Sequence, residues 1–220
     1  MSLTSLDVMK DEVKGMLQGI ERYNPNNTQP LEQYVEMQVR EQAYDLEANL
    51  ALLKLYQFNP SYFSLPVATQ ILLKALANLP HSDFVLCKCL LSHDNLEQEP
   101  IQKLQLLANL LEGCQFAQFW QRAHAMNDLV RTVPGFEDAI RKFVCHVISI
   151  TYQRIPDDTL CELLGLVDEN LVNQWIARNG WKSDESGFVV ISNQDEQIKT
   201  KKITEKIDIE SVAGIMASSF

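Results

Sequence analysis

The sequence predicts a mostly α-helical protein with a helical-repeat domain, a winged-helix domain and a C-terminal helix. Apolar residues recur at steps of three and four through about the first 155 residues. The next segment combines two short helical patterns with a β-branched run, and a last amphipathic pattern ends the chain. We therefore expect a HEAT-like domain of stacked helical hairpins at 1–153, a winged-helix domain at 154–192, and a polar linker with an amphipathic helix at 193–220.

Eight helices are expected in the first domain. Apolar stripes indicate the first three, and proline in the first turn supports two of the later ones. The first runs from Ser5 to a stop at Asn24-Pro25, with Ile20 on its apolar face, and the second covers 31–38. Asp45 caps the third, which ends at Asn59-Pro60. The others cover Pro66–Asn78, Ser82–Leu91, Pro100–Glu112, Phe116–Arg131 and Phe136–Tyr152.

A weak repeat supports stacked hairpins. Leu-Leu-Lys occurs at 52–54 and at 72–74, and Leu-Leu recurs at 106–107, each followed by further apolar residues and a phenylalanine. Each hairpin of a solenoid buries its apolar face against the next, so similar apolar patterns recur along the sequence. Chance recurrence in leucine-rich core helices is the alternative.

The C-terminal part has the pattern of a helix–turn–helix followed by a wing. Pro156–Leu164 is expected to be a short helix, and Asp168 is expected to cap a second one that closes at Asn179-Gly180. The segment 181–183, the turn 184–187 and the run Phe188–Ile191 predict a two-stranded hairpin.

Charge and cysteine content exclude several classes of protein. The formal net charge is −10, and it divides evenly, with 12 basic and 17 acidic residues up to Ile150 and 7 and 12 beyond it. Bulk attraction to a polyanion is therefore excluded, although a local basic patch is not. Five cysteines, mostly within apolar stretches, indicate reduced thiols in an intracellular protein. We expect no secretory signal and no membrane span.

Catalytic and metal-binding patterns are missing. The sequence has no phosphate-binding loop, dinucleotide fingerprint, zinc-protease motif or nucleophile elbow. Cys87 and Cys89 would point about 200° apart on one helix, so they cannot share an ion with His81 and His93. Cys145 and His146 are adjacent on a helix and are expected to be a core thiol beside a boundary histidine. We expect no enzyme activity and no cofactor.

Nucleic-acid recognition is the alternative function. Asn and Gln side chains can bind adenine edges, but phosphate contacts supply most of the affinity. The open face of the second helix of the winged-helix pattern would carry Asn170, Asn173, Gln174, Ala177 and Arg178. Candidate RNA contacts after the wing are Lys199, Lys201, Lys202 and Lys206, although a solvated linker is the more common explanation of such a group.

Long segments resemble a known family. These are GIERYNP at 19–25, AYDLEANLALLKLYQFNP at 43–60, QILLKAL at 70–76, LCKC at 86–89, GFEDAIRKFVCHVISITYQ at 135–153, the turn at 180–187 and IESVAGIMASS at 209–219. Together they closely resemble the subunit K family of eukaryotic translation initiation factor 3, over nearly the whole chain.

The resemblance implies a cytoplasmic, non-enzymatic scaffold subunit. Such a subunit assembles with other initiation factor 3 subunits, most directly subunit L, and reaches the small ribosomal subunit through the complex. Proteins of this architecture meet through wing strands that add edge to edge and through C-terminal helices that form a shared bundle. Carried onto this chain, Phe188, Val189, Val190 and Ile191 would be the sheet edge, and Ile209, Val212 and Met216 would be the bundle stripe.

Overall fold

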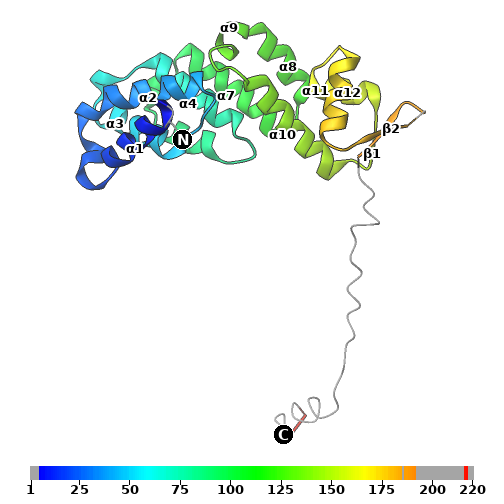
Figure 1. Cartoon of the computed structure of the whole chain (residues 1–220), viewed down its shortest axis with the longest axis horizontal. Coiled ribbons are helices and arrows are strands. Elements are labelled where there is room, and N and C mark those ends of the chain that lie inside the picture. Colours follow the sequence, from blue (N-terminus) through cyan, green and yellow to red (C-terminus); the bar gives the residue numbers. More distant parts are fainter. Residues whose placement is uncertain (1–4, 185, 192–215, 218–220) are drawn as a thin grey trace.

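The protein is an elongated body of helices that ends in a small three-stranded sheet (Figure 1). The computed structural model describes residues 5–184, 186–191 and 216–217. The helices extend along the long axis from α1–α3 at one end to α11 and α12 beside the sheet. Their bounds are α1 Ser5–Met16, α2 Thr28–Arg40, α3 Leu46–Phe58, α4 Leu65–Ala77, α5 Asp83–Cys89, α6 His93–Leu96, α7 Glu99–Glu112, α8 Phe116–Ala125, α9 Asn127–Val130, α10 Phe136–Thr151, α11 Asp157–Leu164 and α12 Glu169–Arg178. The strands are β1 Arg154–Pro156, β2 Lys182–Asp184 and β3 Phe188–Val190, and short 3₁₀ helices cover Gly19–Tyr23, Pro25–Asn27 and Pro60–Tyr62.

Helix α4 is the centre of the helical body. It packs against α2, α3, α5, α7 and α10. Consecutive residues Ile71, Leu72 and Leu73 are all fully buried, as expected for a helix surrounded by protein on every side. Pro66 occupies its first turn, as predicted. Among the described residues, no helix combines the length and hydropathy that a bilayer crossing needs.

Three helix predictions need correction. The single helix expected at Phe116–Arg131 is divided into α8 and α9 at Met126, whose backbone leaves the helical region just before the poor helix formers Asn127 and Asp128. The helix expected at Ser82–Leu91 is shorter, and α6 follows it with Ser92 as its N-cap. Helix α1 ends at Met16, so Ile20 falls in a 3₁₀ turn and is 88% exposed instead of sharing the apolar face.

A buried polar junction around Gln38 joins α2, α3 and α4. The Gln38 Nε2 donates to Asn49 Oδ1 at 2.9 Å, and its Oε1 accepts from the backbone amide of Asp45 at 2.9 Å. Asp45 caps α3, as predicted, by accepting from the amide of Ala48. The Lys74 ammonium donates to the backbone carbonyl of Gln38 at 3.0 Å, in the last turn of α2. Each contact satisfies a group that would otherwise be buried without a partner.

The sheet has three strands, one more than the sequence predicts. Its order is β1-β3-β2, and both pairings are antiparallel. Ile155 lies opposite Val189, which in turn lies opposite Ser183. Strand β1 was missed because it is only three residues long and ends in proline, so no alternation is readable there.

Lys74 yields a prediction on stability and pH. Burial lowers its pKa from 10.5 to about 8. Between these values the unfolded chain binds more protons than the folded one, so folding stability rises with pH across this interval. We expect the free energy of unfolding of the wild type to rise, relative to that of Lys74→Met, by on the order of 2–3 kcal/mol between pH 8 and pH 10.5.

Urea unfolding of both chains across this pH range measures the difference. The raised pKa values of Cys87, Cys145 and Tyr34 act on both chains and cancel. Lys10→Met, at an exposed lysine of α1, controls for the loss of one positive charge. A difference that does not change with pH would contradict the prediction.

Candidate interaction surface

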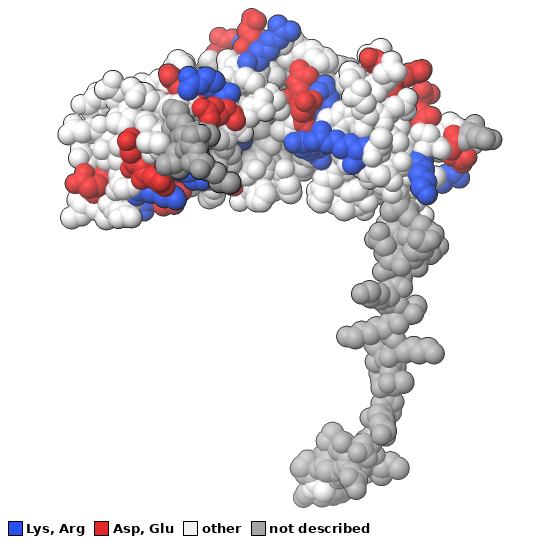
Figure 2. Space-filling model, in the orientation of Figure 1, with Lys and Arg blue, Asp and Glu red and all other residues white. Residues whose placement is uncertain are grey.

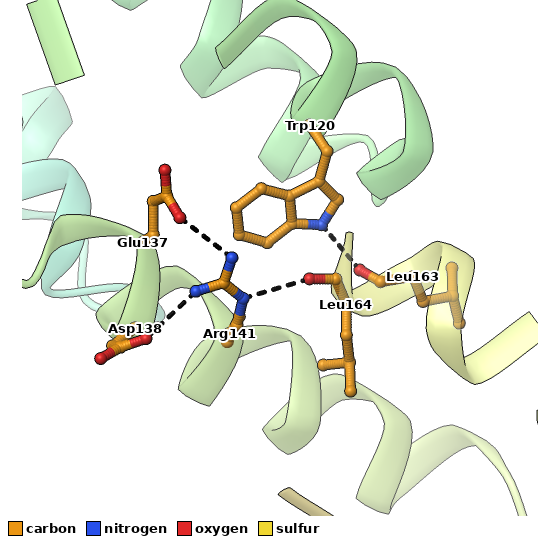
Figure 3. A network of polar contacts seen from close by, with 6 residues as sticks. All are labelled: Trp120, Glu137, Asp138, Arg141, Leu163 and Leu164. Carbon is orange, nitrogen blue, oxygen red and sulfur yellow. Dashed lines mark hydrogen bonds and ion pairs between the residues drawn. The ribbon is translucent and has the colours of Figure 1, made fainter. Parts of the chain in front are cut away.

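The C-terminal end of α11 is held by two side chains of the helical body (Figure 3). The Trp120 Nε1 donates to the carbonyl of Leu163 at 2.9 Å, and the Arg141 Nε donates to the carbonyl of Leu164 at 3.3 Å. The Arg141 guanidinium also lies 4.8 Å from the Trp120 ring centre. These last-turn carbonyls have no partner within their own helix, so the two side chains act as a cap supplied from α8 and α10.

Two carboxylates of α10 hold Arg141 in place. Its Nη1 is 3.1 Å from Asp138 Oδ1, and its Nη2 is 3.0 Å from Glu137 Oε2. The arginine side chain is only 10% exposed, so these ion pairs are partly shielded from water. The network therefore fixes the orientation of α11 and of the strand β1 that precedes it.

Gly165 allows the Trp120 ring to approach this closely. It follows α11 with φ +61, in the left-handed region. A Cβ at this position would overlap the indole ring. Glycine is therefore required here by its backbone conformation and by the ring packed against it.

Helix α12 is anchored through one apolar face. Asp168 caps it, as predicted, by accepting from the amide of Asn170, and Trp175, Ile176 and Val172 are buried. Leu171, next to Val172 in the chain, is 41% exposed. The residues predicted on the open face are all exposed, namely Asn170, Asn173, Gln174, Ala177 and Arg178.

The prediction that Phe188–Ile191 forms the edge of the sheet is wrong. Strand β3 pairs with β1 on one side and β2 on the other, and the amide of Ile191 donates to the carbonyl of Gln153. The backbone of this run is therefore already hydrogen-bonded on both sides. The edges are β1, which ends in Pro156, and β2, whose three residues are all exposed.

The outer face of the sheet mixes apolar and charged side chains. Phe188 and Val190 are each 37% exposed, whereas Val189 between them is fully buried. Arg154 lies 4.9 Å from the Phe188 ring centre and donates to Asp184 Oδ2 at 2.8 Å. Lys182 lies opposite Val190 in the register. The face therefore presents a small apolar patch framed by two basic residues and one acidic residue.

An acidic groove lies on the other side of the same strands. It has a volume of about 340 Å³ and is lined by residues of α11, α12 and β2, including Asp157, Asp158, Glu169, Asn173 and Ser183. Figure 2 shows acidic atoms gathered on the upper side of this end of the molecule and basic atoms on its lower side. Phosphates would be repelled from the groove, whereas Arg154 and Lys182 place positive charge on the outer sheet face.

Several predicted site residues lie outside the described part of the chain. These are Lys199, Lys201, Lys202 and Lys206, and Ile209 and Val212 of the predicted terminal stripe. Met216 is described and is exposed. The predictions made for these residues stay predictions.

The cysteines and histidines do not converge on a site in the described residues. Cys87 is buried and Cys89 exposed, on different sides of α5. Burial raises the pKa of Cys145 to about 11, and His146 beside it is exposed. In the described ranges, no group of three or more His, Cys, Asp or Glu side chains could hold a metal ion.

Sequence reasoning missed Trp120, Arg141 and Arg154. The Trp120 ring also lies near His124, with ring centres 6.4 Å apart. The partners of Trp120 and Arg141 are backbone carbonyls 43 and 23 residues away. Backbone acceptors leave no trace in side-chain patterns, so nothing in the sequence marks these residues as the cap.

The described residues thus define a helical protein whose exposed features are a sheet face, a sheet edge and grooves between helices. The profile of the CSN8/PSMD8/EIF3K family matches residues 62–202. Curated relatives include eukaryotic translation initiation factor 3 subunit K of Xenopus tropicalis and of Mus musculus, each 52% identical over 217 residues that cover 99% of this chain and all of the relative. The Bombyx mori subunit K is also 52% identical and covers 99% of each chain.

The chain belongs to the CSN8/PSMD8/EIF3K family. This confirms the resemblance seen in the sequence segments, including those of the N-terminal part that precede residue 62.

The contact between Gly165 and Trp120 makes a testable prediction. Gly165→Ala should lower the free energy of unfolding by about 2–5 kcal/mol, because it adds left-handed strain and overlap with the indole ring. Gly180→Ala is a matched control, with φ +72 and no atom within 4 Å of the added Cβ. Its free energy of unfolding should fall by only about 1–2 kcal/mol, the cost of the left-handed strain alone. Equal losses in urea unfolding would show that the ring contact does not constrain the fold.

Proposed function

We propose that this chain is a non-catalytic scaffold subunit of a eukaryotic translation initiation factor 3 complex, acting in the cytoplasm during translation initiation. The observation that carries the proposal is the 52% identity to subunit K proteins over essentially the full length of both chains. Identity at this level over whole chains favours a shared assembly surface as well as a shared fold. The proposed role needs no cofactor.

The proposed architecture has a HEAT-like helical-repeat domain at 1–153 and a winged-helix domain at 154–192. Contacts between the successive helices α2 and α3, α4 and α5, and α7 and α8 support stacked hairpins. The order β1-α11-α12-β2-β3, with a three-stranded antiparallel sheet, supports the winged helix. Residues 193–220 are proposed as a polar linker and an amphipathic helix.

Docking is proposed to use the β2 edge and the terminal stripe. Strand β2 is an exposed edge, so an extended segment of a partner could add to it as a fourth strand. Phe188 and Val190 would contribute side chains on the outer sheet face. The proposed partners, taken from the family resemblance, are other initiation factor 3 subunits, most directly subunit L, and through them the small ribosomal subunit.

RNA binding by the winged helix is the second candidate. The observation in its favour is the pair Arg154 and Lys182 beside the exposed Phe188 ring, since a base can stack on an aromatic ring while cations hold phosphates. Against it, α12 offers Arg178 as its cation, which lies over the Trp175 ring, and the acidic groove flanks this helix. We therefore favour protein docking.

Purification of the tagged chain from its own cells separates the two functions. A scaffold subunit should recover initiation factor 3 subunits, and this recovery should persist when salt rises from about 50 to 200 mM. RNA bound through several phosphates should instead be lost by orders of magnitude over the same range, because released counterions oppose binding. Recovery of RNA without those subunits would overturn the scaffold proposal.

Two variants at one position test strand addition. Ser183→Pro removes the amide of the central residue of β2, whereas Ser183→Ala changes the side chain and keeps the amide. We expect Ser183→Pro to lower recovery of partner subunits up to about tenfold, because one main-chain hydrogen bond to the partner is lost. Ser183→Ala should leave recovery unchanged. Thermal unfolding of both purified chains checks that the sheet remains folded. Full recovery with a folded Ser183→Pro chain would exclude the β2 edge.

A further inference from the structure

A cavity at the junction of α4 and α10 contains a buried lysine without a counter-charge. It has a volume of about 200 Å³ and is formed by the loop 42–44, the end of α4 and the residues that begin α10. Two lysines line it, the buried Lys74 and the exposed Lys142, and no lining residue is acidic. This local excess of positive charge stands out in a chain with a net charge of −10.

Lys74 is 6% exposed, and its hydrogen bonding is incomplete. Its ammonium has three protons, and among the described residues it contacts one acceptor, the carbonyl of Gln38. The described part of the chain offers no carboxylate within ion-pair distance of it. Burial alone accounts for the lowered pKa of Lys74, so no neighbouring charge stabilises its charged form.

The buried acid Asp83 is hydrogen-bonded to other residues. The Asp83 carboxylate accepts from the Tyr44 hydroxyl at 2.8 Å and from Asn78 Nδ2 at 2.7 Å. Tyr44 and Asn78 both line the cavity, whereas Asp83 is not among the lining residues. Both partners are neutral groups, and among the described residues no ion pair joins Asp83 to Lys74 or Lys142.

Two residues with positive φ line the cavity. Gln42 has φ +53, in the left-handed region that non-glycine residues rarely adopt, and Gly135 has φ +78. The Gln42 side-chain amide lies against Gly135, so that a Cβ there would be 3.3 Å from Gln42 Nε2. The amide of Gln42 therefore lies at the cavity lining beside Gly135.

We propose that this cavity binds a single oxyanion group, a phosphate or a carboxylate, through Lys74 and Lys142. Its volume lies below the range of about 300–1,000 Å³ that is typical of pockets for whole ligands, so it suits one functional group. The group would accept the remaining Lys74 protons and neutralise both lysines. It could come from a free ion or from a side chain of another protein, and the probes below distinguish these sources.

Thermal unfolding of the full chain in inorganic phosphate, compared with chloride at equal ionic strength, tests the proposal. A ligand that binds the folded state raises Tm in a saturable manner. Lys142→Met should weaken the apparent Kd at least about tenfold, since a charge-assisted hydrogen bond is lost. Ala139→Leu, which adds volume to the lining, should abolish the effect. Lys10→Met is the control and should behave as the wild type. Lys74→Met should also abolish the effect, but the test does not depend on it, because this buried variant could fail to fold.

The probes also identify the source. Acetate and a blocked phosphoserine are tested beside inorganic phosphate. An effect of phosphate alone indicates a free ion, an effect of phosphoserine as well indicates a modified side chain, and an effect of acetate alone indicates a carboxylate side chain. Two results would overturn the proposal: equal Tm shifts in the wild type, Lys142→Met and Ala139→Leu, or no shift with any probe. In either case the cavity would hold only water.

Discussion

The end of helix α11 imposes the constraint on which the C-terminal part of this protein depends. Its last carbonyls are buried against the helical body, so they must be hydrogen-bonded by groups outside their own helix. Trp120 and Arg141 supply those donors, and Glu137 and Asp138 hold the arginine. Because α11 follows directly from β1, this cap also determines where the sheet faces. The exposed edge β2 and the outer sheet face are therefore positioned relative to the helical body through β1 and α11.

Buried polar contacts play the same part inside the helical body. Gln38 and Asn49 are fully buried within a leucine-rich core, yet each is hydrogen-bonded to the other. Apolar contacts alone allow neighbouring helices to slide, whereas a buried amide pair is satisfied in one register only. Lys74 extends this junction to α4 through the Gln38 carbonyl and at the same time faces the cavity beside α10. One residue thus serves both helix packing and the proposed oxyanion site.

The distribution of charge separates the surfaces by function. The acidic groove beside α12 disfavours phosphate, while the outer sheet face combines apolar and basic side chains in a small area. Family membership and full-length similarity to initiation factor subunits fit a protein that acts through such surfaces. A patch of this size binds weakly by itself, so stable docking needs further contacts, and the β2 edge could supply them through main-chain hydrogen bonds.

The amino-acid sequence was enough to predict the helical class, most element positions, the caps at Asp45 and Asp168 and the family, because these depend on local periodicity and on long matching segments. It also predicted the hairpin after Trp181, since its turn and its β-branched run are local signals. The central position of β3 became visible only in the folded chain, because its pairing partner β1 lies more than 30 residues away and is three residues long. The tertiary structure alone likewise revealed the α11 cap and the Lys74 cavity. Their partners are backbone groups and distant helices, and a side-chain pattern along the chain carries no record of either.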